Sequence, residues 1–222
     1  MSELMLDVGT ANEIKMALRR AGAVESDIKA MCTGDFMKGV VGLLRGEYEL
    51  KPVAKAVALA LLVFVGTAMF PGTTEKFVVK DNFVINTEDD TKVKISYLGD
   101  NLKSWFIGKV EDPLSRSELR YHNLKENSLD SPIITKLGGE EKAESSLAEM
   151  FHLMSLQKNG EEGALLNNGW ANIFYIRDVN GVLRAVYVGW DGDGWSVGAD
   201  SIEDRYVWDD DRRVFSRNSV TV

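Results

Sequence analysis

The segment from Trp170 to Asp200, WANIFYIRDVNGVLRAVYVGWDGDGWSVGAD, decides the fold class. Its apolar runs are separated first by Asn180-Gly181 and then by the tetrapeptide DGDG that starts at Asp191. Asn-Gly between apolar runs is the strongest short-range signal of a β-hairpin. The sequence therefore predicts an antiparallel β-meander here. DGDG also resembles the start of a calcium loop, but Trp195 and Ile202 stand where that loop needs oxygen ligands, so a turn is the better interpretation.

Aromatic side chains are concentrated in and beside this meander. Phe174 and Tyr175 are adjacent, so in a regular strand they point to opposite faces of the sheet. Two interpretations follow. Either an outer aromatic face binds a protein, a peptide or a sugar ring, or the long helix covers one face and a neighbouring β segment covers the other. The candidate ligand-binding residues of the first interpretation are Trp170, Tyr175, Tyr187, Trp190, Trp195 and Trp208.

Upstream of the meander the pattern indicates more strands and one major helix. Alternating KVKISYL, together with KFVV and FVIN on either side of residues 80–82, predicts strands, with a helix following from Asp100. Further strands are expected at 119–124 and 132–137. After Gly138-Gly139, an apolar stripe predicts a helix over 141–158 that packs on the sheet.

Residues 10–46 predict three helices: one from about Ala11 to Gly22, a short one at 27–32, and a third from Asp35 to Gly46. The last two have the spacing of a DNA-binding helix-turn-helix. The third helix, however, offers only Lys38 and Arg45 as cations. We therefore interpret 1–52 as a helical interaction or packing module.

An apolar run, AVALALLVFVGTAMF, ends at Phe70. As a helix, Val53 to Phe70 would be about 27 Å long, slightly short of the hydrocarbon core of a bilayer. The first interpretation is a buried or connecting helix over 53–72, and the alternative is a membrane segment. The expected fold class is α+β, with domains 1–52, 53–72 and an antiparallel β-rich body at 73–222.

Composition argues against nucleic-acid binding. The 222 residues include 26 Lys or Arg and 34 Asp or Glu, giving a formal net charge of −8, whereas nucleic-acid binders usually present a basic face. The single cysteine, Cys32, excludes an internal disulfide and is expected to be a buried structural thiol. These features favour a cytoplasmic protein, with membrane association as the alternative.

Chemical motifs are weak. His122 and His152 lack zinc-ligand spacing, so no metal site is predicted. Glu140-Glu141-Lys142, with Asp130, resembles the E-x-K pattern of metal-dependent nucleases, but it lies at a helix start and not on a strand. No phosphate-binding loop is present in the sequence, and we predict no cofactor and no catalytic residue.

Four stretches carry a family resemblance: ANEIKMALRRAG, SYLGDNLKSWFIGKVEDP, NIFYIRDVNGVLRAVYVGWDGDGWSVGA and RRVFSRNS. With them, most of the chain resembles an uncharacterised family of hypothetical proteins from small-genome candidate-phylum bacteria. The region from Val53 to Phe70 carries the least of the likeness. The resemblance implies no activity and no site residue.

These patterns favour a non-enzymatic binding or assembly protein, with the aromatic meander as its interaction surface. Its expected partner is a protein, a peptide or a second copy of the chain. One alternative is a carboxylate- or metal-dependent hydrolase or nuclease that uses Asp130 and Glu140. Another is a membrane-tethered binding protein anchored through Val53 to Phe70.

Overall fold

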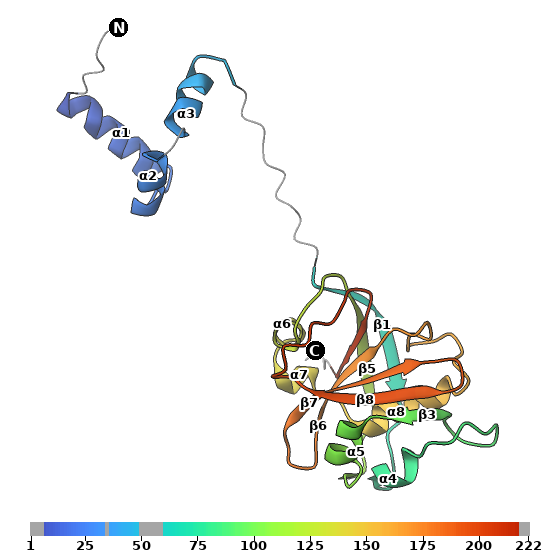
Figure 1. Ribbon diagram of the computed structural model, residues 1–222. Helices are drawn as coiled ribbons and strands as arrows, with labels where there is room; N and C mark the ends of the chain where they lie inside the picture. Colours follow the sequence, from blue (N-terminus) through green and yellow to red (C-terminus); the bar gives the residue numbers. More distant parts are fainter. Residues whose placement is uncertain (1–6, 34–35, 49–59, 218–222) are drawn as a thin grey trace. The chain divides into compact units, whose positions relative to one another are not determined.

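The computed structural model describes residues 7–33, 36–48 and 60–217. The chain divides into two compact units, Met1–Val57 and Ala58–Val222. The described part of the first unit contains α1 (Val8–Arg20), α2 (Glu25–Met31) and α3 (Phe36–Leu44) (Figure 1). The three predicted helices are thus confirmed. Helix α1 begins earlier than expected, because Asp7 and not Thr10 caps it, with the Asp7 carboxylate accepting from Thr10 N at 2.7 Å.

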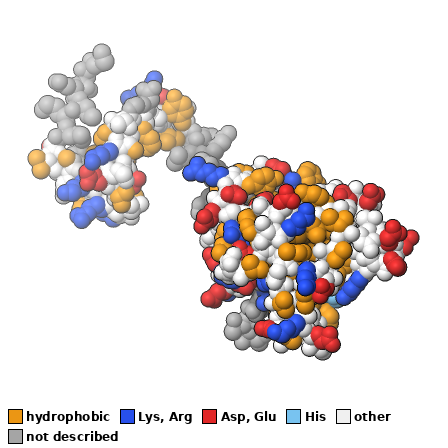
Figure 2. Space-filling model, turned by 60° about the horizontal axis from the view of Figure 1, so that its bottom comes forward, with side chains coloured by type: hydrophobic (Ala, Val, Ile, Leu, Met, Phe, Trp, Pro, Cys, Tyr) orange, Lys and Arg blue, Asp and Glu red, His pale blue; other side chains and the backbone are white. Residues whose placement is uncertain are grey.

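The first unit has almost no interior. Of its described residues only Gly42 is buried, and apolar side chains such as Phe36 and Leu44 are exposed (orange in Figure 2). Cys32 is also exposed, so the expected buried thiol is wrong. The reason is that the short helices do not enclose a core in which a thiol could be buried.

The second unit is built on a seven-stranded mixed sheet with the order β1-β5-β9-β6-β7-β8-β3. The pairs β9–β6 and β8–β3 are parallel, and the other neighbours are antiparallel. The strands are β1 (Leu62–Phe70), β3 (Ile95–Leu98), β5 (Ser117–Leu124), β6 (Asn172–Arg177), β7 (Leu183–Trp190), β8 (Trp195–Ser201) and β9 (Arg213–Ser216). A second, two-stranded sheet pairs β2 (Phe77–Val78) with β4 (Val110–Glu111).

The described residues of this unit, 60–217, form five helices: α4 (Val79–Asn82), α5 (Asp100–Phe106), α6 (Asp130–Leu137), α7 (Glu140–Ala143) and α8 (Leu147–Leu156). Together with the sheets and the N-terminal helices, they make the protein an α+β protein, as predicted. None of the helices in the described ranges has the length and apolar character needed to cross a membrane.

The predicted meander is strands β6, β7 and β8. Its first turn is held by Asp178, whose carboxylate accepts from Asn180 N at 2.8 Å and from Val182 N at 3.0 Å. Gly181 has a φ of +78°, which explains the Asn-Gly pair. In the second turn Asp191 N donates to Gly194 O, and Gly192 has a φ of +99°. DGDG is therefore a hairpin turn, as the sequence favoured.

Both faces of the sheet are covered. On one face, Phe174 and Ile176 pack in a large apolar cluster with residues of α5 and α8. On the other, Ile173 and Tyr175 pack in a smaller cluster with residues of α6 and α7 and with Trp208. In Figure 1, α8 lies behind β8, and α6 and α7 lie apart from it. The two clusters place α6 and α7 on the face of the sheet opposite α8. The covered-sheet interpretation of Phe174 and Tyr175 is thus correct for the face under α8, whereas the other face is covered by α6, α7 and Trp208 and not by the predicted β segment.

The connecting helix predicted over 53–72 is wrong where the structure can test it. Residues 62–70 form strand β1, which pairs with β5 from Leu62 to Phe70; residues 53–59 lie outside the described residues. An uninterrupted apolar run fits a buried helix and a strand equally well. The β-branched Val63, Val65 and Thr67 favour the strand, and β5 supplies the partner.

Three smaller predictions also change. The strand expected at 132–137 is helix α6, in which Ile133, Ile134 and Leu137 are buried at helical spacing. Of the strands expected on either side of residues 80–82, only the short β2 forms, because α4 follows it directly. The single helix expected over 141–158 is divided into α7 and α8, because Ser145 N donates to Tyr175 O at 2.8 Å and holds the chain extended between them.

A buried carboxylate fixes the start of α8. Glu111, on β4, accepts from Leu147 N at 3.1 Å and from Ala148 N at 2.9 Å, and Lys109 Nζ lies 3.0 Å from its Oε1. Those amides have no acceptor within the helix, and a negative charge at this end is favoured by the helix dipole. Glu111 thereby ties the small sheet to the helix that covers the large one.

Glu111→Ala should lower the free energy of unfolding by about 3 kcal/mol, because two buried amides lose their acceptor and the Lys109 ammonium, which also donates to Arg177 O, loses its carboxylate partner. Urea unfolding followed by circular dichroism measures the change. Asp112→Ala is the matched control, since the Asp112 side chain is 83% exposed and its loss should leave the transition nearly unchanged. Equal effects of the two substitutions would contradict this role for Glu111.

Candidate functional site

Three of the six aromatic residues predicted to bind a ligand are core residues. Tyr175 and Trp195 are fully buried and Trp208 is 3% exposed, so these side chains cannot form an outer binding face. Trp195 donates through Nε1 to Gln157 O at 3.1 Å, and Trp208 donates to Asp130. Their polar atoms are thus used within the protein.

The other three do not share one surface. Trp170 is 44% exposed and stacks with the guanidinium of Arg212, whose Cζ lies 3.9 Å from its ring. Trp190 is half-buried and packs edge-on against Trp195 on the face covered by α8. Tyr187 is half-buried on the opposite face and contacts Trp208. The sheet alternation between positions 187 and 190 therefore separates them.

Tyr187 instead belongs to a group of three tyrosines that we call the tyrosine surface: Tyr97, Tyr187 and Tyr206, with Asp200 beside them. Tyr97 and Tyr206 are 52% and 51% exposed. Tyr187 and Tyr206 both contact the edge of Trp208, with ring centroids 5.5 and 5.0 Å away. The tyrosine surface thus lies over a buried tryptophan floor.

Backbone geometry sets the orientation of Tyr187. Its partner across β7 and β8 is Gly198, and a Cβ atom at Gly198 would overlap the Tyr187 ring. The absence of a side chain lets the ring lie flat on β8. The carboxylate of Asp200 is near enough to the Tyr187 hydroxyl to raise its pKa. The orientation of the Tyr187 ring is therefore set by its close approach to the Gly198 backbone.

Beneath the tyrosine surface, Asp130 holds the tryptophan floor in place. Its Oδ1 accepts from the Tyr175 hydroxyl and from Trp208 Nε1, both at 2.8 Å, and the residue is 2% exposed. Asp130 begins α6, Tyr175 lies on β6, and Trp208 follows β8. One carboxylate thus joins three separate segments.

Negative charge dominates this region. Burial raises the pKa of Asp130 above its usual value, and the nearby Asp200 and Asp204 add to the shift. Burial and the charge of Asp204 likewise raise the pKa of Asp200. Burial, Asp200 and the neighbouring Tyr206 and Tyr97 raise the pKa of Tyr187. Burial is the largest cause of all three shifts, and the negative neighbours are the smaller one.

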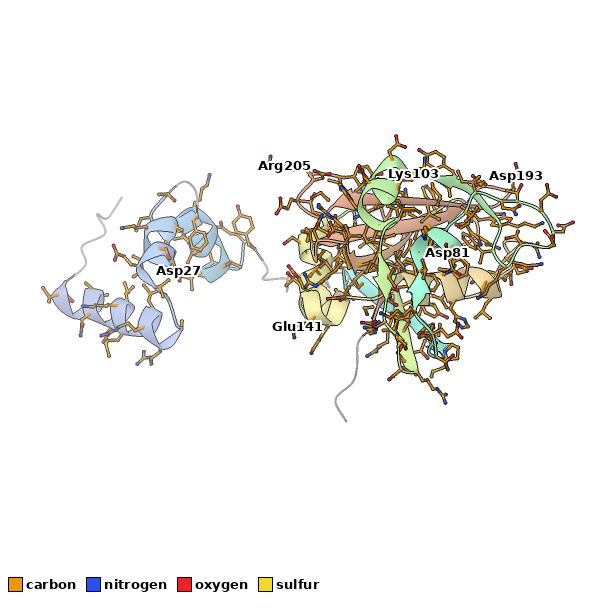
Figure 3. The ribbon with its side chains drawn as sticks, turned by 90° about the horizontal axis from the view of Figure 1, so that it is seen from below. Asp27, Asp81, Lys103, Glu141, Asp193 and Arg205 are labelled. Atoms are coloured by element: carbon orange, nitrogen blue, oxygen red, sulfur yellow. The ribbon has the colours of Figure 1, made fainter. Side chains whose placement is uncertain are left out.

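Two basic side chains lie at the rim. Lys103 Nζ is 5.9 Å from the centroid of the Tyr97 ring and 3.4 Å from Asp100 Oδ1. Arg205 immediately precedes Tyr206 and is exposed. Figure 3 shows both labelled side chains at the upper edge of the β body. A cation therefore already lies over the Tyr97 ring, whereas the charged group that raises the pKa of Tyr187 is the carboxylate of Asp200.

Sequence reasoning missed Tyr97 and Tyr206. Strict alternation placed Tyr97 on the same buried face as Ile95, but a register shift between Ile95 and Tyr97 turns the tyrosine outward. Tyr206 lies in an irregular segment after β8, where no periodic pattern applies. The only feature of the sequence that could have indicated this surface is the concentration of aromatic and acidic residues in 200–208.

The other chemical candidates are dispersed. His122 packs against Phe64 on β1 and His152 packs against Phe70, each half-buried, with burial lowering both pKa values. Glu140 pairs with Arg177 at 3.1 Å, whereas Asp130 is engaged with Tyr175 and Trp208. Within 7–33, 36–48 and 60–217, no group of three or more His, Cys, Asp or Glu side chains is placed to hold a metal ion.

Comparison with known proteins found no matching family model, no similar curated protein and no similar solved structure. The resemblance to the candidate-phylum family stays a prediction.

Asp130→Asn tests the buried carboxylate, because asparagine keeps an acceptor but cannot ionise. The raised pKa means that the folded protein retains a proton that the unfolded chain releases. The stability contributed by Asp130 is therefore full below the unfolded pKa of about 4 and is lost as the pH rises through the folded pKa.

The unfolding free energy of the wild type should thus fall relative to Asp130→Asn as the pH rises from about 4 through the folded pKa. Urea titrations of both proteins across this range measure the difference. Asp193→Asn, in the exposed β7–β8 turn (Figure 3), controls for the loss of one negative charge. A difference that does not change with pH would contradict the assignment.

Proposed function

We propose that this protein is a non-enzymatic binding protein whose tyrosine surface takes a basic segment of a protein partner. The observation that carries the proposal is the group of two exposed tyrosines, Tyr97 and Tyr206, and the half-buried Tyr187 near Asp200, over a buried tryptophan. The carboxylates of Asp200 and Asp204 lie close enough to one another and to Asp130 to raise carboxyl pKa values here, in addition to the larger effect of burial. A lysine or arginine side chain of a partner would pair with these carboxylates.

Tyrosine is suited to this role. Its ring face attracts a cation, and its hydroxyl bonds to polar groups at the rim of an interface. Tyrosine is also enriched at protein interfaces. The formal net charge of −8 attracts a basic partner over longer range.

The shape of the surface favours a protein segment over a small molecule or a sugar ring. Small-ligand sites are concave, yet three cavities of about 500, 140 and 390 Å³ are lined by other residues. None of the tyrosine-surface residues lines these three cavities. The exposed rings of Tyr97 and Tyr206 could contact a basic segment that lies across them.

The proposal predicts that a short arginine- and lysine-rich peptide binds the full chain, and that a glutamate-rich peptide of equal length does not. Combining Tyr206→Ala with Asp204→Asn should weaken binding about tenfold, because one ring face and one charge are lost. Calorimetry or peptide fluorescence anisotropy measures the affinity, which should fall as salt is added.

The control substitution is Tyr48→Ala, which removes an exposed tyrosine of the first unit and should leave peptide affinity unchanged. Thermal unfolding of each variant checks that the tryptophan floor is intact. Equal affinity for the two peptides, or unchanged affinity in the Tyr206 and Asp204 variant, would overturn the proposal.

A further inference from the structure

Strand β1 is an open edge of the large sheet. It stands first in the strand order and pairs on one side with β5; in the described part of the chain its other side has no strand partner. The nine residues LVFVGTAMF carry no charge. Four of their apolar side chains, those of Val63, Phe64, Val65 and Met69, are 41% to 49% exposed. A long, uncharged edge strand is a ready template for pairing with another strand.

The opposite edge of the sheet is protected. Strand β3 has four residues, and its Ile95 is bridged to Asn86 by two backbone hydrogen bonds of 2.9 Å. β1 has one protective feature, a bulge between Phe64 and Gly66. From Gly66 to Phe70 its register with β5 is regular, and at this end the His152 side chain lies beside the Met69 backbone.

We propose that β1 pairs antiparallel with the β1 strand of a second copy of this chain, so that the two large sheets continue into one another across a two-fold axis. Backbone groups along a strand edge are matched by another extended strand. A two-fold interface brings the same patch of both copies together. Because β1 is uncharged, this pairing carries no like-charge repulsion between the strands.

The side chains near β1 favour a second copy over a foreign peptide. Strand addition of a foreign peptide gains its specificity from pockets for alternate side chains. Beside β1 a cavity of about 140 Å³ lies at the Leu62 end, lined in part by His122 and Lys136. The exposed valine, phenylalanine and methionine side chains along β1 match the same residues in another β1.

The test is the oligomeric state of the full chain, measured by sedimentation equilibrium over a range of concentrations. The wild type should form dimers. A variant with Val63→Lys and Met69→Lys, which places two charges on β1, should raise the dimer dissociation constant by about a hundredfold. In the wild type, hydrogen exchange of β1 amides should slow as the protein concentration rises.

The matched control carries Val84→Lys and Val110→Lys, two equally charged changes at side chains that are 51% and 50% exposed elsewhere on the second unit. This variant should dimerise as the wild type does. Thermal unfolding verifies that both variants are folded, and both should still bind the basic peptide through the tyrosine surface. A monomeric wild type, or dimers that survive the two β1 lysines, would overturn the inference.

Discussion

The structure of the β body depends on one constraint: the central hairpin of β6 and β7 is apolar on both faces, so both faces must be covered. In β6 every residue from Asn172 to Ile176 is buried. Water cannot be left on either side of such a strand without exposing a row of large apolar side chains. The α5 and α8 layer on one face, and the α6, α7 and Trp208 layer on the other, both follow from this.

Buried carboxylates position these layers. Glu111 accepts from the first amides of α8, and Asp130 accepts from Tyr175 and Trp208. Glu149 is fully buried and accepts from Ser117 Oγ at 2.6 Å and from Arg217 Nε at 2.8 Å. Each carboxylate joins segments that are distant in the chain. A buried charge without such donors would be costly, so each also restricts how its layer can pack.

The two units differ in how completely they bury their apolar side chains. The second unit encloses two apolar clusters, and most of its large aromatic residues lie within them. The first unit leaves Ile14, Phe36 and Leu44 exposed among its described residues. The first unit thus consists of short amphipathic helices. The second unit has a buried core and presents an uncharged edge strand and the tyrosine surface. Surfaces of this kind support the proposal of a binding or assembly protein better than an enzymatic role.

Local sequence by itself determined the hairpins and the N-terminal helices. Asn180-Gly181 and DGDG specify tight turns through positive φ, and the helical periodicity of 10–46 needs no distant partner. Only the tertiary structure decided the rest. The run ending at Phe70 is a strand because β5 pairs with it, and Tyr175, Trp195 and Trp208 are buried because helices and loops from elsewhere cover them. Tyr97 became accessible through a single register shift. Burial and strand pairing are set by contacts between distant segments, which local patterns do not encode.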